Sequence, residues 1–323
     1  MLRILVTFVV FTNFATAANA GEKADKRQLP FPPIADTWQS LDRALDAVAG
    51  TSNQLFTFSD ARQHIVTTPF AAGRTRTERF GKITDSKRHD AYQDGRDDPA
   101  VRGAVVAGNR LLVMNAKRLT MISVFIKDMK ETIRRTIPID LIRPPRDRVG
   151  EAPEFEVKEY RAKIKREFAK SDRLPFAGMA ALPDAWRKTK NELLVLSRMP
   201  SFPLIILGCD PDEPSQCKAT RGCFTHFPAG VKPQDLRGVA TYGKNKWVLV
   251  GDPSKRQIHI LKYNSCHDVR ATRSLKLPDK LKNLRNLWVS ESGDLFVVTD
   301  EPDWYHNASL YTWPEAVWTS VAN

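Results

Sequence analysis

Oxygen-bearing side chains recur at one position in five successive segments of this chain. Each lies in a short polar loop between two apolar runs, and the five residues are Asp60, Asn115, Ser197, Asp252 and Asp300. Carboxylate and amide oxygens that converge on one point suit a hard cation such as calcium. A carbonyl or phosphoryl group bound to that cation is then open to attack by activated water. A structural role competes with this interpretation, because such residues also bond their own backbone in turns.

The last of these loops also contains aromatic rings, Trp304 and Tyr305. An exposed Trp–Tyr pair beside carboxylates is able to stack on a sugar ring and accept its hydroxyl hydrogen bonds. Two further tryptophans, Trp288 and Trp313, are expected to fill the core instead. We predict ligand contacts at Asp60, Asn115, Asp252, Asp300, Glu301, Trp304 and Tyr305, with Asp252 and Asp300 as metal ligands.

Sequence motifs do not identify a catalytic residue. The chain has no GxSxG, P-loop, GxGxxG or HExxH motif, and its six histidines have no metal-ligand spacing. This weakens an enzymatic interpretation without removing it.

The elements that position the polar loops form five repeats. Each repeat has a short leading strand, a turn rich in Gly, Asn or Pro, an apolar strand, the polar loop and a third apolar strand. The repeats begin near Leu45, Gly103, Gly178, Gly238 and Asn286. Alternating apolar residues bounded by turn formers predict strands. Because each unit is too short to bury its own apolar faces, the pattern predicts an all-β fold, a β-propeller of five or six blades.

Two of the loops carry a family resemblance. The residues concerned are Asp60 with Arg62 and Ile65, and Asp252 with Arg256 and Ile258. They resemble the NHL-type repeats of the six-bladed propeller superfamily, which also contains calcium propellers of the gluconolactonase type. The resemblance extends over roughly residues 45–313, but the repeats begin 48 to 75 residues apart instead of about 40. It implies a calcium-dependent hydrolase or lactonase as an alternative function.

The N-terminus has the pattern of an export signal. Arg3 precedes an apolar run, and Ala18-Asn19-Ala20 matches a signal-peptidase site. A membrane anchor is the alternative, but the run is shorter than the roughly 20 residues that span a bilayer. We therefore predict a signal peptide at 1–20, an extended leader at 21–40 and a single propeller domain at 41–323. The destination is the bacterial periplasm or the exterior, and no transmembrane segment is expected.

An amphipathic helix is predicted at residues 154–171, within the long interval between the repeat starts at Gly103 and Gly178. Val157, Tyr160, Ile164 and Phe168 fall on one face, and basic residues crowd the others. Such a helix either packs on its parent domain or lies on an anionic surface.

Net charge and cysteines suggest partners and compartment. The formal charge is +13, and favours an anionic partner or polysaccharide, although the basic residues are spread along the chain and are also consistent with simple solubility.

Four cysteines fit an oxidising compartment. Three pairings are open, and local spacing favours Cys209 with Cys217 and Cys223 with Cys266. A zinc site is the alternative, without supporting ligand spacing.

These observations favour an exported propeller that binds a ligand or partner and lacks a catalytic motif. No nucleic acid is expected as a partner. Calcium is the cofactor that the acidic loops would hold.

Overall fold

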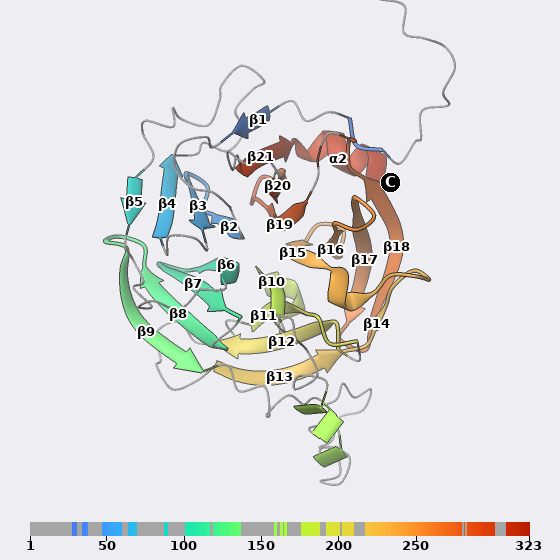
Figure 1. Ribbon diagram of the computed structural model, residues 1–323, viewed down its shortest axis with the longest axis horizontal. Helices are drawn as coiled ribbons and strands as arrows, with labels where there is room; N and C mark the ends of the chain where they lie inside the picture. The colour runs from blue at the N-terminus through green and yellow to red at the C-terminus, as the bar shows by residue number, and fades with distance from the viewer. Residues whose placement is uncertain are drawn as a thin grey trace, which may run out of the picture.

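Most of the chain that the structure describes is β-strand, arranged in five separate sheets (Figure 1). The structure is a computed structural model. It describes residues 28–30, 34–37, 47–59, 64–69, 87–89, 101–116, 119–136, 158–159, 162–163, 165–166, 176–187, 192–200, 202–209, 217–279, 281, 283–300 and 308–323. The predicted signal peptide at 1–20 lies outside these residues.

Each of the first three sheets is a four-stranded antiparallel meander in chain order. The first contains β2 (Ala47–Gly50), β3 (Gln54–Ser59), β4 (His64–Pro69) and β5 (Lys87–His89). The second contains β6 (Val101–Ala107), β7 (Arg110–Asn115), β8 (Thr120–Phe125) and β9 (Lys130–Thr136). The third contains β10 (Phe176–Ala181), β11 (Glu192–Ser197), β12 (Leu204–Cys209) and β13 (Cys217–Cys223).

The last two sheets depart from this simple order. The fourth contains β15 (Arg237–Tyr242), β16 (Trp247–Asp252), β17 (Gln257–Ser265) and β18 (Asp268–Lys276), with β14 (Thr225–His226) added in parallel to β18. The fifth contains β19 (Leu284–Val289), β20 (Leu295–Asp300), β21 (Ala308–Trp313) and β1 (Ile34–Thr37). Two 3₁₀ turns, η3 (Asp184–Trp186) and η4 (Pro233–Asp235), and helix α2 (Glu315–Ala322) complete the described elements.

The five predicted repeats correspond to the five sheets. The first strands of the sheets, β2, β6, β10, β15 and β19, begin within two residues of the predicted starts. Each of these inner strands contacts the inner strands of the sheets before and after it, and β19 contacts β2. The sheets therefore radiate from a common axis, in a propeller-like arrangement (Figure 1).

Glycines allow the inner strands to approach one another closely at one end of this axis. A Cβ added to Gly103 would lie 2.5 Å from Met179 Cβ, and one added to Gly178 would lie 2.8 Å from Val239 N. A Cβ at Gly238, which has a φ of +66°, would lie 2.7 Å from Asn286 Cα. Only glycine leaves room for backbone to meet backbone at these distances. The inner strands are therefore drawn together near their first residues.

The hydrophobic core is divided into layers between neighbouring sheets. Four buried clusters each combine side chains from two adjacent sheets, from the first and second to the fourth and fifth. Phe56 and Leu111 belong to one such layer, and Leu194 and Val248 to another. No sheet could bury these faces alone, which is the physical reason for the repeat.

The N-terminal segment completes the last sheet. Strand β1 pairs antiparallel with β21, in register Ile34 with Thr312. Leu29 is buried, and Trp313 Nε1 donates a hydrogen bond of 2.9 Å to Pro30 O. The outermost strand of this sheet thus comes from the N-terminal segment, whereas residues 317–321 lie in helix α2.

A disulfide joins the third and fourth sheets. Cys223 and Cys266 are bonded, as predicted, with a Cα–Cα distance of 4.5 Å. Cys209 is also disulfide-bonded, and the register of β12 and β13 places it opposite Cys217, as the predicted pairing requires. The zinc interpretation is therefore wrong for Cys209, Cys223 and Cys266.

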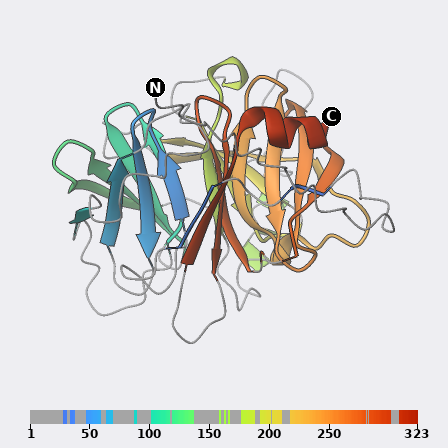
Figure 2. The same ribbon diagram turned by 90° about the horizontal axis from the view of Figure 1, so that it is seen from above.

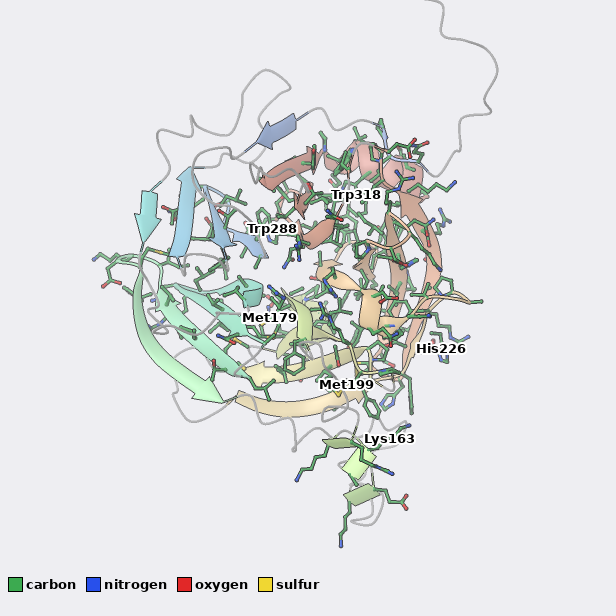
Figure 3. All side chains as sticks on the ribbon, in the orientation of Figure 1. Lys163, Met179, Met199, His226, Trp288 and Trp318 are labelled. Atoms are coloured by element: carbon green, nitrogen blue, oxygen red, sulfur yellow. A yellow bond between two sulfur atoms is a disulfide. The ribbon has the colours of Figure 1, made fainter. Side chains whose placement is uncertain are left out.

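The predicted insertion is helical where the structure describes it. Residues 158–159, 162–163 and 165–166 have helical backbone and are exposed. Lys163 lies 6.0 Å from the ring centroid of Phe202, outside the circle of sheets (Figure 3). The apolar face predicted for this helix lies outside the described residues. Among the described helices, none has the length and apolar character that crossing a bilayer requires.

Candidate functional site: an axial pocket

A pocket of about 380 Å³ lies on the common axis of the five sheets. All five inner strands, or the turns that follow them, contribute to its wall. The lining residues are Ala49, Gly50, Thr51, Ala104, Val105, Val106, Gly108, Met179, Ala180, Ala181, Val239, Ala240, Thr241, Leu287, Trp288, Val289 and Glu291. Small-molecule pockets commonly occupy roughly 300–1,000 Å³. This axial pocket is therefore large enough for a small ligand.

The axial pocket lies at the end of the axis where the inner strands finish. The close glycine contacts of Gly103, Gly178 and Gly238 lie at the other end, near the first residues of the same strands. The inner strands have small side chains at most pocket positions, such as Ala180 and Ala240. The inner strands therefore approach most closely at one end of the axis, and small side chains leave room for the axial pocket at the other.

Trp288 breaks the five-fold similarity of the pocket wall. The contacts of Gly238 with Asn286 and of Gly178 with Gly238 align Trp288 with Ala240 and Ala180. Its ring packs on Gly50, where an added Cβ would lie 2.5 Å from the indole. The ring of Phe296 lies at a centroid distance of 4.7 Å. The indole thus fills the junction between the fifth and first sheets, and it is partly exposed near the centre of the circle of sheets (Figure 3).

Among the described residues, the axial pocket has one carboxylate, Glu291, which lies at its exposed edge in the turn after β19. Ser290 N donates to Asp294 O at 3.0 Å, and Asp294 N donates to Ser290 Oγ at 3.0 Å. Ser292 Oγ donates to Asp294 Oδ2 at 3.0 Å. These bonds fix the turn that carries Glu291. A carboxylate there favours neutral hydroxylated or cationic ligands and repels anions.

Helix α2 lies across the same end of the strands as the axial pocket (Figure 2). Tyr242 OH donates a hydrogen bond to Glu315 Oε1, and Lys244 Nζ lies 2.8 Å from the same oxygen. Trp318 Nε1 donates to Gly293 O at 2.8 Å. The helix therefore braces the turns that follow β15 and β19.

Two pKa values follow from this network. Burial raises the pKa of the Tyr242 hydroxyl well above its ordinary value, and the hydrogen bond to the Glu315 carboxylate adds to this. The hydrogen bond from Lys244, together with that from Tyr242, lowers the pKa of Glu315. The pair therefore stays as a neutral phenol and a carboxylate at neutral pH.

Asp252 lies at the opposite end of the fourth sheet and is buried in a polar network. Its Oδ1 accepts hydrogen bonds from Ser254 Oγ at 2.6 Å and Lys255 N at 3.1 Å. Its Oδ2 lies 3.1 Å from His259 Nε2, and His259 Nδ1 lies 2.8 Å from Ser274 Oγ. Burial raises the pKa of Asp252, but its hydrogen bonds with His259, Ser254 and Lys255 outweigh this and lower it.

The arrangement at Asp252 does not favour a calcium site there. Both carboxylate oxygens already have hydrogen-bonding partners, so a cation would have to displace them. Asp300 ends β20, but its side chain is outside the described part, and its role as a metal ligand stays a prediction. Within the described residues, no three or more His, Cys, Asp and Glu side chains are grouped as metal ligands would be.

The other predicted site residues either lie away from the axial pocket or are not among the residues that the structure describes. Asn115 pairs with Val101, and Ser197 pairs with Phe176, so both lie beside the first residues of inner strands. Both are buried, and Ser197 Oγ accepts a hydrogen bond of 3.0 Å from Met199 N. The predicted ligand residues outside the described part are Asp60, Glu301, Trp304 and Tyr305.

The candidate residues predicted from the sequence belong to a different set of turns from those beside this pocket. In the chain they come at or after the ends of the second strands, whereas the axial pocket lies beside the turns after the first strands. One signal was available: Trp288 is much bulkier than its counterparts in the other leading strands. The prediction that Trp288 and Trp313 fill the core is confirmed for Trp313, which is fully buried, whereas Trp288 packs on Gly50 but is partly exposed to the axial pocket.

Comparisons with known proteins give no family. No protein-family model matches the chain, and no curated protein matches it.

Solved structures give only distant likenesses. A functionally unknown protein from Desulfotomaculum acetoxidans is 13% identical, with a TM-score of 0.39; the match covers 79% of this chain and 63% of that one. Glutaminyl cyclase from Myxococcus xanthus is 8% identical, with a TM-score of 0.45 and coverages of 87% and 96%. A nidogen/laminin complex contains a chain that is 13% identical, with a TM-score of 0.40 and coverages of 82% and 74%. These values are too low to carry an argument about function.

Proposed function

We propose that this chain is an exported five-bladed β-propeller that binds a small neutral ligand in its axial pocket. Five sheets radiating from one axis, with β19 in contact with β2, support the architecture. The Cys223–Cys266 disulfide supports an oxidising compartment, together with the export pattern at residues 1–20. The proposed role is binding, without chemistry on the ligand.

The observation that carries this proposal is the composition of the axial pocket. Among the described lining residues, one indole, Trp288, and one carboxylate, Glu291, stand among mostly aliphatic side chains and two threonine residues. An aromatic face stacks on the apolar side of a sugar ring, and a carboxylate accepts hydrogen bonds from its hydroxyl groups. The ligand proposed here is therefore a neutral sugar of one or two residues.

Saturation-transfer NMR with glucose, galactose, N-acetylglucosamine and their disaccharides tests this assignment on the protein beginning at Gly21. We expect at least one of these sugars to bind. Glu291→Gln keeps the shape of the side chain and removes its charge, and it should weaken that binding by about tenfold, the loss of one charge-assisted hydrogen bond.

Glu159→Gln provides the matched control, because Glu159 is exposed on the helical insertion outside the circle of sheets. It should bind the sugar as the unaltered protein does. Failure of every sugar to bind, or equal losses in Glu291→Gln and Glu159→Gln, would overturn the proposal.

A further inference from the structure

Basic residues gather on the strand that comes last in chain order in each of the first four sheets; in the fourth sheet the two-residue strand β14 lies outside this strand. Strands β5, β9, β13 and β18 together contain ten Lys and Arg residues but only two acidic ones, Glu131 and Asp268. The second and third strands of the same sheets contain two of each kind. These four outer strands therefore supply eight of the thirteen net charges of the chain.

The fold places these strands around the circumference of the molecule. Figure 1 shows β5, β9, β13 and β18 following one another along the outer edge. We refer to these four strands as the basic belt. The charges are scattered in the sequence because each outer strand comes last in its sheet, and the radial arrangement brings them onto one continuous rim.

Charges of strand β18 face solvent. The side chain of Arg270 is 68% exposed, and Lys276 is also exposed. Asp268, the one acidic residue of the strand, lies 2.5 Å from Arg270. Not every member is available: Arg221 of β13 is mostly covered and lies 3.1 Å from the buried Glu192.

We infer that the basic belt binds a flexible anionic polysaccharide. A linear polyanion is able to follow a curved rim and contact several sheets at once, whereas a planar bilayer touches only part of it. Duplex DNA is stiff, and bending it around the rim of one small domain is energetically costly. Single-stranded nucleic acid relies on aromatic stacking platforms, and β5, β9, β13 and β18 contain no Phe, Tyr or Trp.

This inference uses the exported location of the proposed function but not its axial pocket. The Glu291 carboxylate would repel an acidic chain, so the two ligands occupy different places. A neutral sugar belongs to the axial pocket, and the acidic polymer belongs to the rim.

The experiment measures binding of fluorescently labelled polygalacturonate by anisotropy at 25 to 200 mM NaCl. One variant reverses two charges on β18, Arg270→Glu with Lys276→Glu. A second reverses two on β9, Lys130→Glu with Arg134→Glu. The control, Lys232→Glu with Lys255→Glu, makes the same charge change at two exposed residues outside the basic belt.

We expect each belt variant to weaken binding about tenfold, from two lost surface ion pairs, and the control to lose much less. Binding should fall as salt rises, since exposed charges are screened. A variant that combines all four substitutions, on β18 and β9, should bind polygalacturonate more weakly than either double variant, because the basic belt extends over several sheets. Thermal melts, and the neutral pair Arg270→Gln with Lys276→Gln, separate lost charge from misfolding.

Several results would overturn the inference. They are no binding at 25 mM NaCl, an equal loss in the control, tighter binding of poly-uridylate, or tighter binding of phosphatidylserine vesicles. Glu291→Gln should leave polygalacturonate binding unchanged. If no neutral sugar binds but polygalacturonate still does, only the proposal for the axial pocket is rejected.

Discussion

Gly178→Ala is the most direct test of the close packing along the axis. The Cβ added there would lie 2.8 Å from Val239 N and 2.9 Å from Gly238 Cα and C. These are backbone atoms of the neighbouring inner strand, so no side-chain rotation relieves the contact. Gly178 does not have a positive φ, and alanine is allowed by its own backbone conformation.

The expected cost is therefore one of overpacking alone. Core substitutions that overpack usually lower the free energy of unfolding by about 1–3 kcal/mol. Because Gly178→Ala would meet backbone atoms of β15, which cannot rotate away, we expect a loss of about 3 kcal/mol. Urea unfolding followed by circular dichroism should show a lower midpoint with an unchanged m-value, since the folded and unfolded surfaces stay the same.

Gly243→Ala is the matched control. Its added Cβ would meet Pro183 Cβ at 3.5 Å, an ordinary van der Waals contact. The free energy of unfolding should change little, or rise by about 0.4–1 kcal/mol because alanine restricts the unfolded chain. If Gly178→Ala and Gly243→Ala have unfolding midpoints that agree within error, the inner strands do not approach as described and the reasoning is refuted.

Two further predictions concern stability. Replacing both Cys223 and Cys266 by Ser removes a disulfide that links residues 43 positions apart, and should lower the free energy of unfolding by up to about 4 kcal/mol. A thermal unfolding midpoint equal to that of the disulfide-bonded protein would contradict this. Asp252→Asn removes a buried partner of His259 and should cost about 1–3 kcal/mol at pH 7. Because the folded pKa of Asp252 is lowered, its carboxylate stabilises the fold above the unfolded value near about 3.9 and loses this effect as the pH falls. The difference between the urea midpoints of the two proteins should therefore shrink as the pH falls below about 3.9, and a difference that stays constant from pH 7 to pH 3 would count against the assignment.

The strands were predictable because their signals are local. Apolar alternation and turn formers lie within a few residues of each other, so Gly103, Gly178 and Gly238 marked three leading strands correctly. The Cys223–Cys266 pair was also predicted, since the short spacing of Cys209 and Cys217 favours their pairing and leaves the other two cysteines for each other. The number of sheets was left at five or six, because residues between repeats gave no clear strand pattern.

The position of the pocket was not predictable in the same way. Gly50 and Trp288 meet although most of the chain separates them, and nothing near either residue signals the other. The polar loops attracted attention because Asp and Asn suit cations, yet Asp252 uses both carboxylate oxygens within its own sheet. Local residue type did not distinguish a turn-forming carboxylate from a ligand.

By itself, the sequence determined that the chain consists of repeated strand units, each with apolar faces too small to bury alone. Period-two alternation and turn residues act over short distances, and they require no knowledge of the partner strand. Only the tertiary structure decided which ends of the inner strands open into a pocket. It also decided that basic residues from four separate outer strands share one rim, because both properties depend on how the sheets are placed around the axis.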